Sequence, residues 1–102
     1  MNAKIKSDNT DLLFQAILSL HSLEECYAFF DDLCTVPELK AMSQRYAVAK
    51  MLSEGEIYTD IVENTGASTA TISRVNRALN YGSDGYALTL KRINETEKEN
   101  DV

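Results

Sequence analysis

The stretch ENTGASTATISRVNRAL, from Glu63 to Leu79, places small polar residues between apolar ones that recur at helical spacing. Gly66 interrupts this pattern, and Ser68 follows it as a residue type that caps the N-termini of helices. The stretch therefore predicts the end of one helix, a turn at the glycine, and a second helix that begins after the serine. Because residues 58–65 form a short helical pattern just upstream, the two predicted helices span about residues 58–80.

Two short helices joined through a glycine fit a helix-turn-helix motif. Ile61 and Val62 then face inward on its first helix, and Ile72 and Val75 form the inward pair on its second helix. Two positions depart from the usual pattern. Val62 stands where a small residue is usual, and Thr65 stands where an apolar residue is usual.

One side of the second helix of the motif carries no residue that is expected to pack in the core. At about 100° per residue, its apolar residues gather on one side, and the opposite side carries Ala70, Ser73, Arg74 and Arg77. Small residues let a helix enter the major groove of DNA, and arginines can reach phosphate or guanine. The alternative is the solvated face of an ordinary surface helix. Threonines are poor helix formers at exposed positions, so their presence favours contact with double-stranded DNA.

Capping sequences place the helices that precede the motif. Apolar spacing predicts a first helix over about residues 8–20. The sequences SLEE at Ser22–Glu25 and TVPE at Thr35–Glu38 are capping boxes that open a second and a third helix. The third helix runs to about Glu54 and ends at Gly55. Its apolar residues cover more than one side, so this helix needs neighbours in several directions.

The whole chain is predicted to be all-α, with six helices and no strand. The last helix runs from Gly85 to about Glu97. We expect a flexible N-terminal arm over residues 1–7, a helical domain over residues 8–97, and an acidic C-terminal tail over residues 98–102. A chain of 102 residues buries a modest share of its surface alone, so pairing with a second copy would stabilise it.

The formal net charge of −6 is distributed unevenly along the chain. Residues 1–35 carry two basic and six acidic groups, a balance of −4, and residues 94–102 carry one and four, a balance of −3. Residues 36–56 are balanced, and residues 57–93 carry four basic and three acidic groups, a balance of +1. The acidic total therefore does not exclude DNA binding by the middle of the chain, and it does not indicate such binding either.

Several function classes find no support in the sequence. Cys26 and Cys34 lie about 12 Å apart along one predicted helix, too far for a disulfide, and are interpreted as buried thiols. His21 is the only histidine, and no ligand cluster surrounds it, so no metal site is predicted. No nucleophile–base pair or phosphate-cradling glycine loop indicates an enzyme, and no catalytic residue is predicted. The absence of a long apolar run and of a leader predicts a cytoplasmic protein with no membrane partner.

The segment PELKAMSQRYAVAKMLSEGE, followed by GASTATISRVNRAL, resembles the Trp repressor superfamily, and most closely its YerC/YecD branch. The resemblance covers roughly residues 10–93, and GASTATISR is its most specific segment. It implies a six-helix fold in which two chains intertwine as a homodimer through their first three helices and the last one. It also implies a sequence-specific transcriptional regulator, a repressor, that reads a palindromic operator with half-sites about one DNA turn apart.

The resemblance assigns roles by position. Thr69, Ala70 and Ser73 match residues that read base edges in the Trp repressor. The resemblance and the outer side of the second helix together predict eight residues that contact DNA. They are Thr59, Ser68, Thr69, Ala70, Thr71, Ser73, Arg74 and Arg77.

A co-repressor pocket is the second site that the resemblance implies. Arg45 and Arg74 match the arginines that enclose tryptophan, and Thr35 matches a threonine of the same pocket. Two departures argue against tryptophan as the co-repressor, because Val75 replaces a glycine and Ala78 replaces a serine. Overpacking by a valine costs about 1–3 kcal/mol where a ring would have to lie. No cofactor is therefore predicted, although tryptophan or another small-molecule co-repressor stays open as an alternative.

A second class of function stays open beside DNA binding. A helical dimeric protein-interaction module could keep the fold and have lost DNA binding. The acidic net charge favours this alternative, as does the first helix of the motif, which has Thr59 and Val62 where the Trp repressor has basic phosphate contacts.

Overall fold

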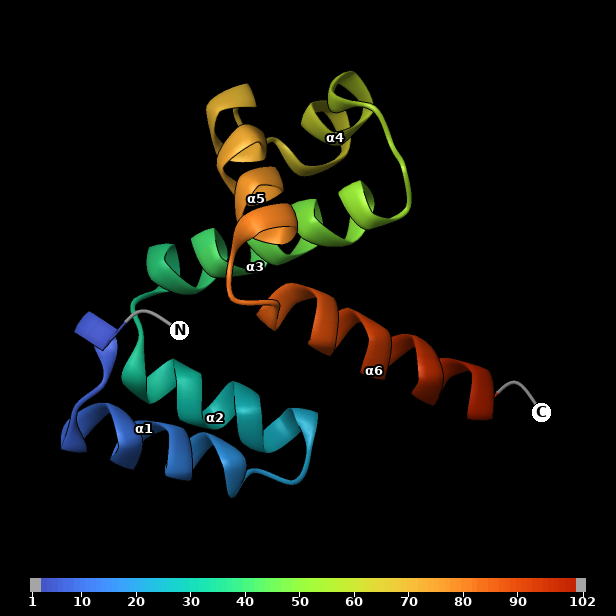
Figure 1. Cartoon of the computed structure of the whole chain (residues 1–102). Helices are drawn as coiled ribbons and strands as arrows, with labels where there is room; N and C mark the ends of the chain where they lie inside the picture. Colours follow the sequence, from blue (N-terminus) through green and yellow to red (C-terminus); the bar gives the residue numbers. More distant parts are fainter. Residues whose placement is uncertain (1–2, 101–102) are drawn as a thin grey trace. The chain divides into compact units, whose positions relative to one another are not determined.

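The computed structural model describes the backbone of residues 3–100 and the side chains of residues 3–98. This part of the chain is helical, with connecting turns, and contains no strand (Figure 1). After a 3-10 turn, η1 (Ala3–Ile5), come the helices α1 (Asp8–Leu18), α2 (Leu23–Leu33), α3 (Val36–Ser53), α4 (Tyr58–Thr65), α5 (Thr69–Tyr81) and α6 (Gly85–Asn100). The prediction of an all-α fold with six helices is confirmed. None of the helices in the described part is long and apolar enough to span a membrane.

The ends of the chain differ in detail from the predicted segments. The turn η1 falls within residues 1–7, the predicted arm, and α6 continues three residues beyond residue 97, to Asn100. Residues 1–2 and 101–102 of the arm and the tail lie outside the described residues.

The chain divides into two compact units, residues 1–40 and residues 41–102. Helix α3 begins in the first unit at Val36 and continues into the second as far as Ser53.

Capping by side chains sets where the helices of the first unit begin. The Ser22 hydroxyl accepts the N–H of Glu25 at 3.1 Å, and the Glu25 carboxylate accepts the N–H of His21 at 2.9 Å. The glutamate thus reaches one residue further back than a reciprocal capping box would require. At the start of α3 the box is reciprocal, because Thr35 and Glu38 each accept the backbone N–H of the other, at 3.3 and 2.9 Å.

The first unit lacks a core of its own. No residue of α1 or α2 is buried, and large apolar side chains are open to solvent, including Leu18 at 82% exposure and Leu23 at 78%. Cys26 and Cys34 are free thiols that are only half-buried. The interpretation of both as buried thiols is therefore wrong for the single chain, since nothing in this unit covers them completely.

The second unit has a closed apolar core to which four helices contribute. Its buried members are Val48 and Ala49 of α3, Ile61 of α4, Ala67 of the turn, Ile72 and Val75 of α5, and Leu90 of α6. The inward positions predicted for the motif are confirmed, with Val62 partly buried against the same core. Burial of these side chains holds α4 and α5 against α3.

Two turns of the second unit require glycine, at Gly55 and at Gly82. Gly55 has a φ of 81°, and the N–H groups of Gly55 and Glu56 donate to the carbonyls of Leu52 and Met51, both at 3.1 Å. This Schellman motif ends α3 where the glycine predicted a stop. Between α5 and α6, a Cβ on Gly82 would collide with the backbone carbonyl of Ala78, so only glycine fits there.

Candidate nucleic-acid interface

Helix α4, the turn after it and helix α5 form the predicted helix-turn-helix. Gly66 ends α4 in the left-handed conformation, with a φ of 72°, and its N–H donates to the Val62 carbonyl at 2.9 Å. Ser68 has extended backbone, and its hydroxyl accepts the N–H of Thr71 at 3.1 Å as the N-cap of α5. The glycine and the serine therefore do what their residue types predicted.

Thr65 shows how a polar residue fits a position that is usually apolar in this motif. Its hydroxyl donates to the Ile61 carbonyl at 2.6 Å and accepts the N–H of Ala67 at 3.1 Å. Its own carbonyl accepts the side-chain amide of Gln44, on α3, at 3.1 Å. Gln44 has no signature in the sequence, because no local pattern links this residue to a turn twenty-one positions away.

The outer side of α5 is open to solvent. Of the residues predicted to contact DNA, all are exposed except Thr71, which is half-buried with its hydroxyl 3.1 Å from that of Ser68. Thr59 lies on α4, Ser68 caps α5, and the others lie on α5 itself. Because Ile72 and Val75 fill the core from the same helix, α5 has one packed side and one free side.

The charges of the motif are concentrated on its second helix. Arg74 and Arg77 are the basic residues of α5, and both are exposed. Helix α4 carries Asp60 and Glu63, also exposed, and has no basic residue. An anionic ligand would therefore be attracted by α5 and repelled by the acidic groups of α4.

The residues predicted for a co-repressor pocket are placed in different surroundings. Val75 is 2% exposed and belongs to the core, whereas Arg45, Arg74 and Ala78 are exposed. Thr35 lies in the first unit, where its hydroxyl caps α3. Within the second unit, Val75 therefore packs against its own chain.

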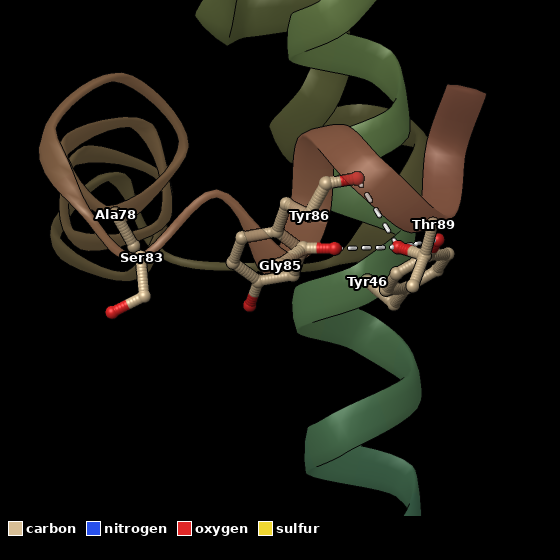
Figure 2. Close-up of a pocket in the computed structure, with 6 residues that line it drawn as sticks. All are labelled: Tyr46, Ala78, Ser83, Gly85, Tyr86 and Thr89. Carbon is tan, nitrogen blue, oxygen red and sulfur yellow. Dashed lines mark hydrogen bonds between the residues drawn. The ribbon is translucent and has the colours of Figure 1, made fainter. Parts of the chain in front are cut away.

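The second unit has a hollow of about 410 Å³ beside the end of α5, and it shares only Ala78 with the predicted pocket. Its lining is Tyr46, Ala78, Ser83, Gly85, Tyr86 and Thr89 (Figure 2). The Tyr46 hydroxyl donates to the Thr89 hydroxyl at 2.6 Å, and the rings of Tyr46 and Tyr86 lie 5.9 Å apart. No lining residue is charged, so the hollow offers no arginine to hold a carboxylate such as that of an amino acid. Sequence reasoning missed this hollow because its walls come from three helices, α3, α5 and α6, and the turn between the last two.

Metal ligands do not gather among the side chains that the structure describes. There, no group of three or more His, Cys, Asp or Glu residues is placed to hold a metal ion.

Comparison with known proteins gives consistent similarities over almost the whole chain. A family model described as Trp repressor protein matches residues 8–94. The uncharacterized protein YerC of Bacillus subtilis (strain 168) is 57% identical over 96 residues, which cover 94% of this chain and 92% of that protein.

Two solved structures are similar in both fold and sequence. The crystal structure of a TrpR-like protein from Eubacterium eligens ATCC 27750 has a TM-score of 0.88 and 58% identity, covering 91% of this chain and 96% of that one. The crystal structure of a Trp repressor candidate from Staphylococcus aureus also has a TM-score of 0.88, with 53% identity over 92% of this chain and 95% of that one.

Proposed function

Because this chain belongs to the Trp repressor protein family, we propose that it is a sequence-specific DNA-binding regulator of transcription that represses its target as a homodimer. The family is one of regulators, and the chain is not an enzyme.

One observation carries the proposal of DNA binding. The side of α5 opposite its buried residues is exposed, small toward its N-terminus and basic further along. In the proposed complex, Thr69, Ala70 and Ser73 meet base edges in the major groove, and Arg74 and Arg77 reach phosphate or guanine. Thr59, Ser68 and Thr71 supply hydroxyl groups next to this surface, where they contact the DNA backbone.

The exposed apolar surface of the first unit supports a homodimer. No residue of α1 or α2 is fully buried in the single chain, and Leu88 and Ile93 of α6 are 47% and 43% exposed. A second copy that covers these side chains would remove them from water, which stabilises the pair by roughly 25 cal/mol per Å² of apolar surface. Two-fold symmetry then presents two copies of α5 to a palindromic operator with half-sites about one DNA turn apart.

Tryptophan is not required in the proposed mechanism. Val75 packs in the core, where the Trp repressor has a glycine beside its co-repressor. The residues predicted to line that pocket are Thr35, Arg45, Arg74, Val75 and Ala78. The hollow beside Ala78 has uncharged walls and does not suit an amino acid. We therefore propose a regulator whose DNA affinity does not depend on this co-repressor.

Selection of bound sequences from a random pool of double-stranded DNA tests the proposal. We expect a palindromic site, and an affinity for it that falls steeply with salt concentration. The variants Arg74→Ala and Arg77→Ala should each weaken binding. Where the arginine contacts a phosphate, both subunits of the homodimer lose that contact, so the salt slope should fall by about 1.8, or about 0.9 for each contact. Arg92→Ala on α6 makes the same change at an exposed position outside the motif and serves as the control. If Arg74→Ala and Arg77→Ala bound the operator as tightly as the wild type and the Arg92→Ala control, α5 would not be the contact surface.

A second candidate function is a protein-interaction module without DNA binding. The observation that favours it is the pair of exposed acids on α4, Asp60 and Glu63, next to a turn that DNA-binding motifs bring close to phosphates. The wild-type chain would then show no retention on random-sequence DNA even at low salt. It would instead recover a protein partner in a pull-down.

A further inference from the structure

The turn of the helix-turn-helix is tied to α3 by one side chain. Gln44 donates its amide N–H to the carbonyl of Thr65, the last residue of α4, at 3.1 Å. Both residues are half-buried and belong to the same compact unit. The bond spans twenty-one positions of sequence, so it joins two elements that local structure would not connect.

The other hydrogen bonds of this turn are local. The Thr65 hydroxyl bonds the carbonyl of Ile61 and the N–H of Ala67, and the Gly66 N–H bonds the carbonyl of Val62. These contacts set the shape of the turn, but they cannot orient it against α3. The Gln44 amide also lies over the glycine, because a Cβ on Gly66 would be 4.0 Å from its nitrogen.

A hydrogen bond orients the turn in a way that apolar packing does not. Apolar contacts have little directional preference, whereas a hydrogen bond weakens steeply as its donor–hydrogen–acceptor angle departs from linear. The Thr65 hydroxyl bonds only within the turn, so the bond from Gln44 to the Thr65 backbone carbonyl is a directional contact that joins the turn to α3. Loss of the donor would leave the Thr65 carbonyl half-buried without this partner.

We propose that Gln44 is a positioning residue for DNA binding, which sets the orientation of the helix-turn-helix relative to α3. This inference rests on the proposed function and goes one step beyond it. Helix α5 begins three residues after Gly66, so a shift of the turn moves Thr69 and Ala70, the first residues at the proposed base edges. In a homodimer, the orientation of each motif on α3 determines the separation of the two copies of α5. Gln44 thereby makes the protein selective for one spacing of the operator half-sites.

The experiment compares variants that remove one hydrogen bond of α3 each. Gln44→Met keeps the length of the side chain and removes the donor. Gln44→Glu removes the donor while the side chain stays polar, but it adds a negative charge, so its readouts are the spacing preference and the hydrogen exchange and not the affinity alone. Tyr46→Phe is the matched control, because it removes the 2.6 Å bond from the same helix to Thr89 of α6 and leaves the turn untouched. Affinities are measured for the selected operator and for versions with one base pair inserted or deleted between the half-sites. Hydrogen exchange of the Gly66 and Ala67 amides is measured on the same proteins.

Gln44→Met should bind the optimal operator about three- to tenfold more weakly, because fixing a freed turn on binding costs up to about the worth of one neutral hydrogen bond. Gln44→Glu should bind more weakly still, because its negative charge repels phosphate. Both variants should also lose part of the wild-type preference for the correct spacing and exchange the two amides faster. Tyr46→Phe should keep the spacing preference and the slow exchange. A simple loss of stability would weaken binding to all operators equally, so the spacing preference separates positioning from folding.

Wild-type spacing preference and wild-type exchange in both Gln44 variants would overturn the inference. Failure of the wild-type chain to bind any DNA would instead overturn the proposed function. In that case the exchange of Gly66 and Ala67 still decides whether Gln44 holds the turn.

Discussion

Arg74 and Val75 are neighbours in α5, yet the arginine side chain is exposed and the valine is 2% exposed in the core. The relationship follows from helical geometry, because a step of about 100° turns the next residue away from the solvent side. It separates two residues that the resemblance assigns to one co-repressor pocket. The valine belongs to the packing that holds α5, and the arginine remains free for an external partner.

Tryptophan is accordingly expected to leave operator affinity unchanged. The chain contains no tryptophan residue, so the fluorescence of added tryptophan would report its binding directly. We expect neither a change in that fluorescence nor a shift in the DNA-binding curve. Tighter operator binding with added tryptophan would contradict the prediction.

Val75→Gly tests the structural role of the valine. The substitution removes a buried side chain and places glycine inside a helix, so the free energy of unfolding should fall by roughly 2–4 kcal/mol. Denaturant titration measures this loss. A variant as stable as the wild type would show that Val75 does not support the core.

Gly82, after α5, and Gly85, the first residue of α6, should respond differently to substitution by alanine. A Cβ on Gly82 would strike the Ala78 carbonyl, so Gly82→Ala should lower the free energy of unfolding by about 1–3 kcal/mol. Gly85 has open space around its Cβ position, so Gly85→Ala should be neutral or stabilising by up to about 1 kcal/mol. Thermal unfolding of the two variants provides a matched comparison. Equal effects would mean that crowding at Gly82 is not what selects glycine there.

Ser68 and Ser73 are both proposed to contact DNA, but only Ser68 also caps α5, so the two substitutions should differ in their effect on stability. Ser68→Ala removes the hydroxyl that caps α5, which should cost about 1 kcal/mol of stability. Ser73→Ala lies on the exposed side of the helix and exchanges serine for a better helix former, so stability should hold or rise slightly. Operator affinity should nevertheless fall in the Ser73 variant, since a proposed base contact is lost. Unchanged affinity would remove Ser73 from the interface.

The start of α3 should lose stability in acid. Hydrogen bonds from Thr35, first from its backbone N–H and then from its side chain, lower the pKa of Glu38 below its usual value of 4.5. A carboxyl with a lowered pKa in the folded state stabilises the fold above its usual pKa, and this contribution is lost as the pH falls through the lower, folded-state value. Stability should therefore fall less between pH 7 and acid in Glu38→Gln than in the wild type. Identical pH dependence of the two proteins in denaturant titrations would contradict this.

Much of the motif could be read from local sequence, because the forces that set it act over a few residues. The stop at Gly66, the cap at Ser68 and the alternation of Ile72 and Val75 with Ser73 and Arg74 follow from backbone sterics, hydroxyl geometry and helical period. These features determined where α4 ends, where α5 begins and which side of α5 is free. The roles of the free residues stay predictions.

Only the tertiary structure decided how the motif is held and what surrounds it. The bond from Gln44 to Thr65 and the hollow between Tyr46 and Tyr86 each join segments far apart in the chain. Neither has a local signature, because a side chain's partner across the fold depends on how whole helices pack. The same holds for the cysteines of the first unit, whose half-burial reflects the lack of a core there and not their residue type.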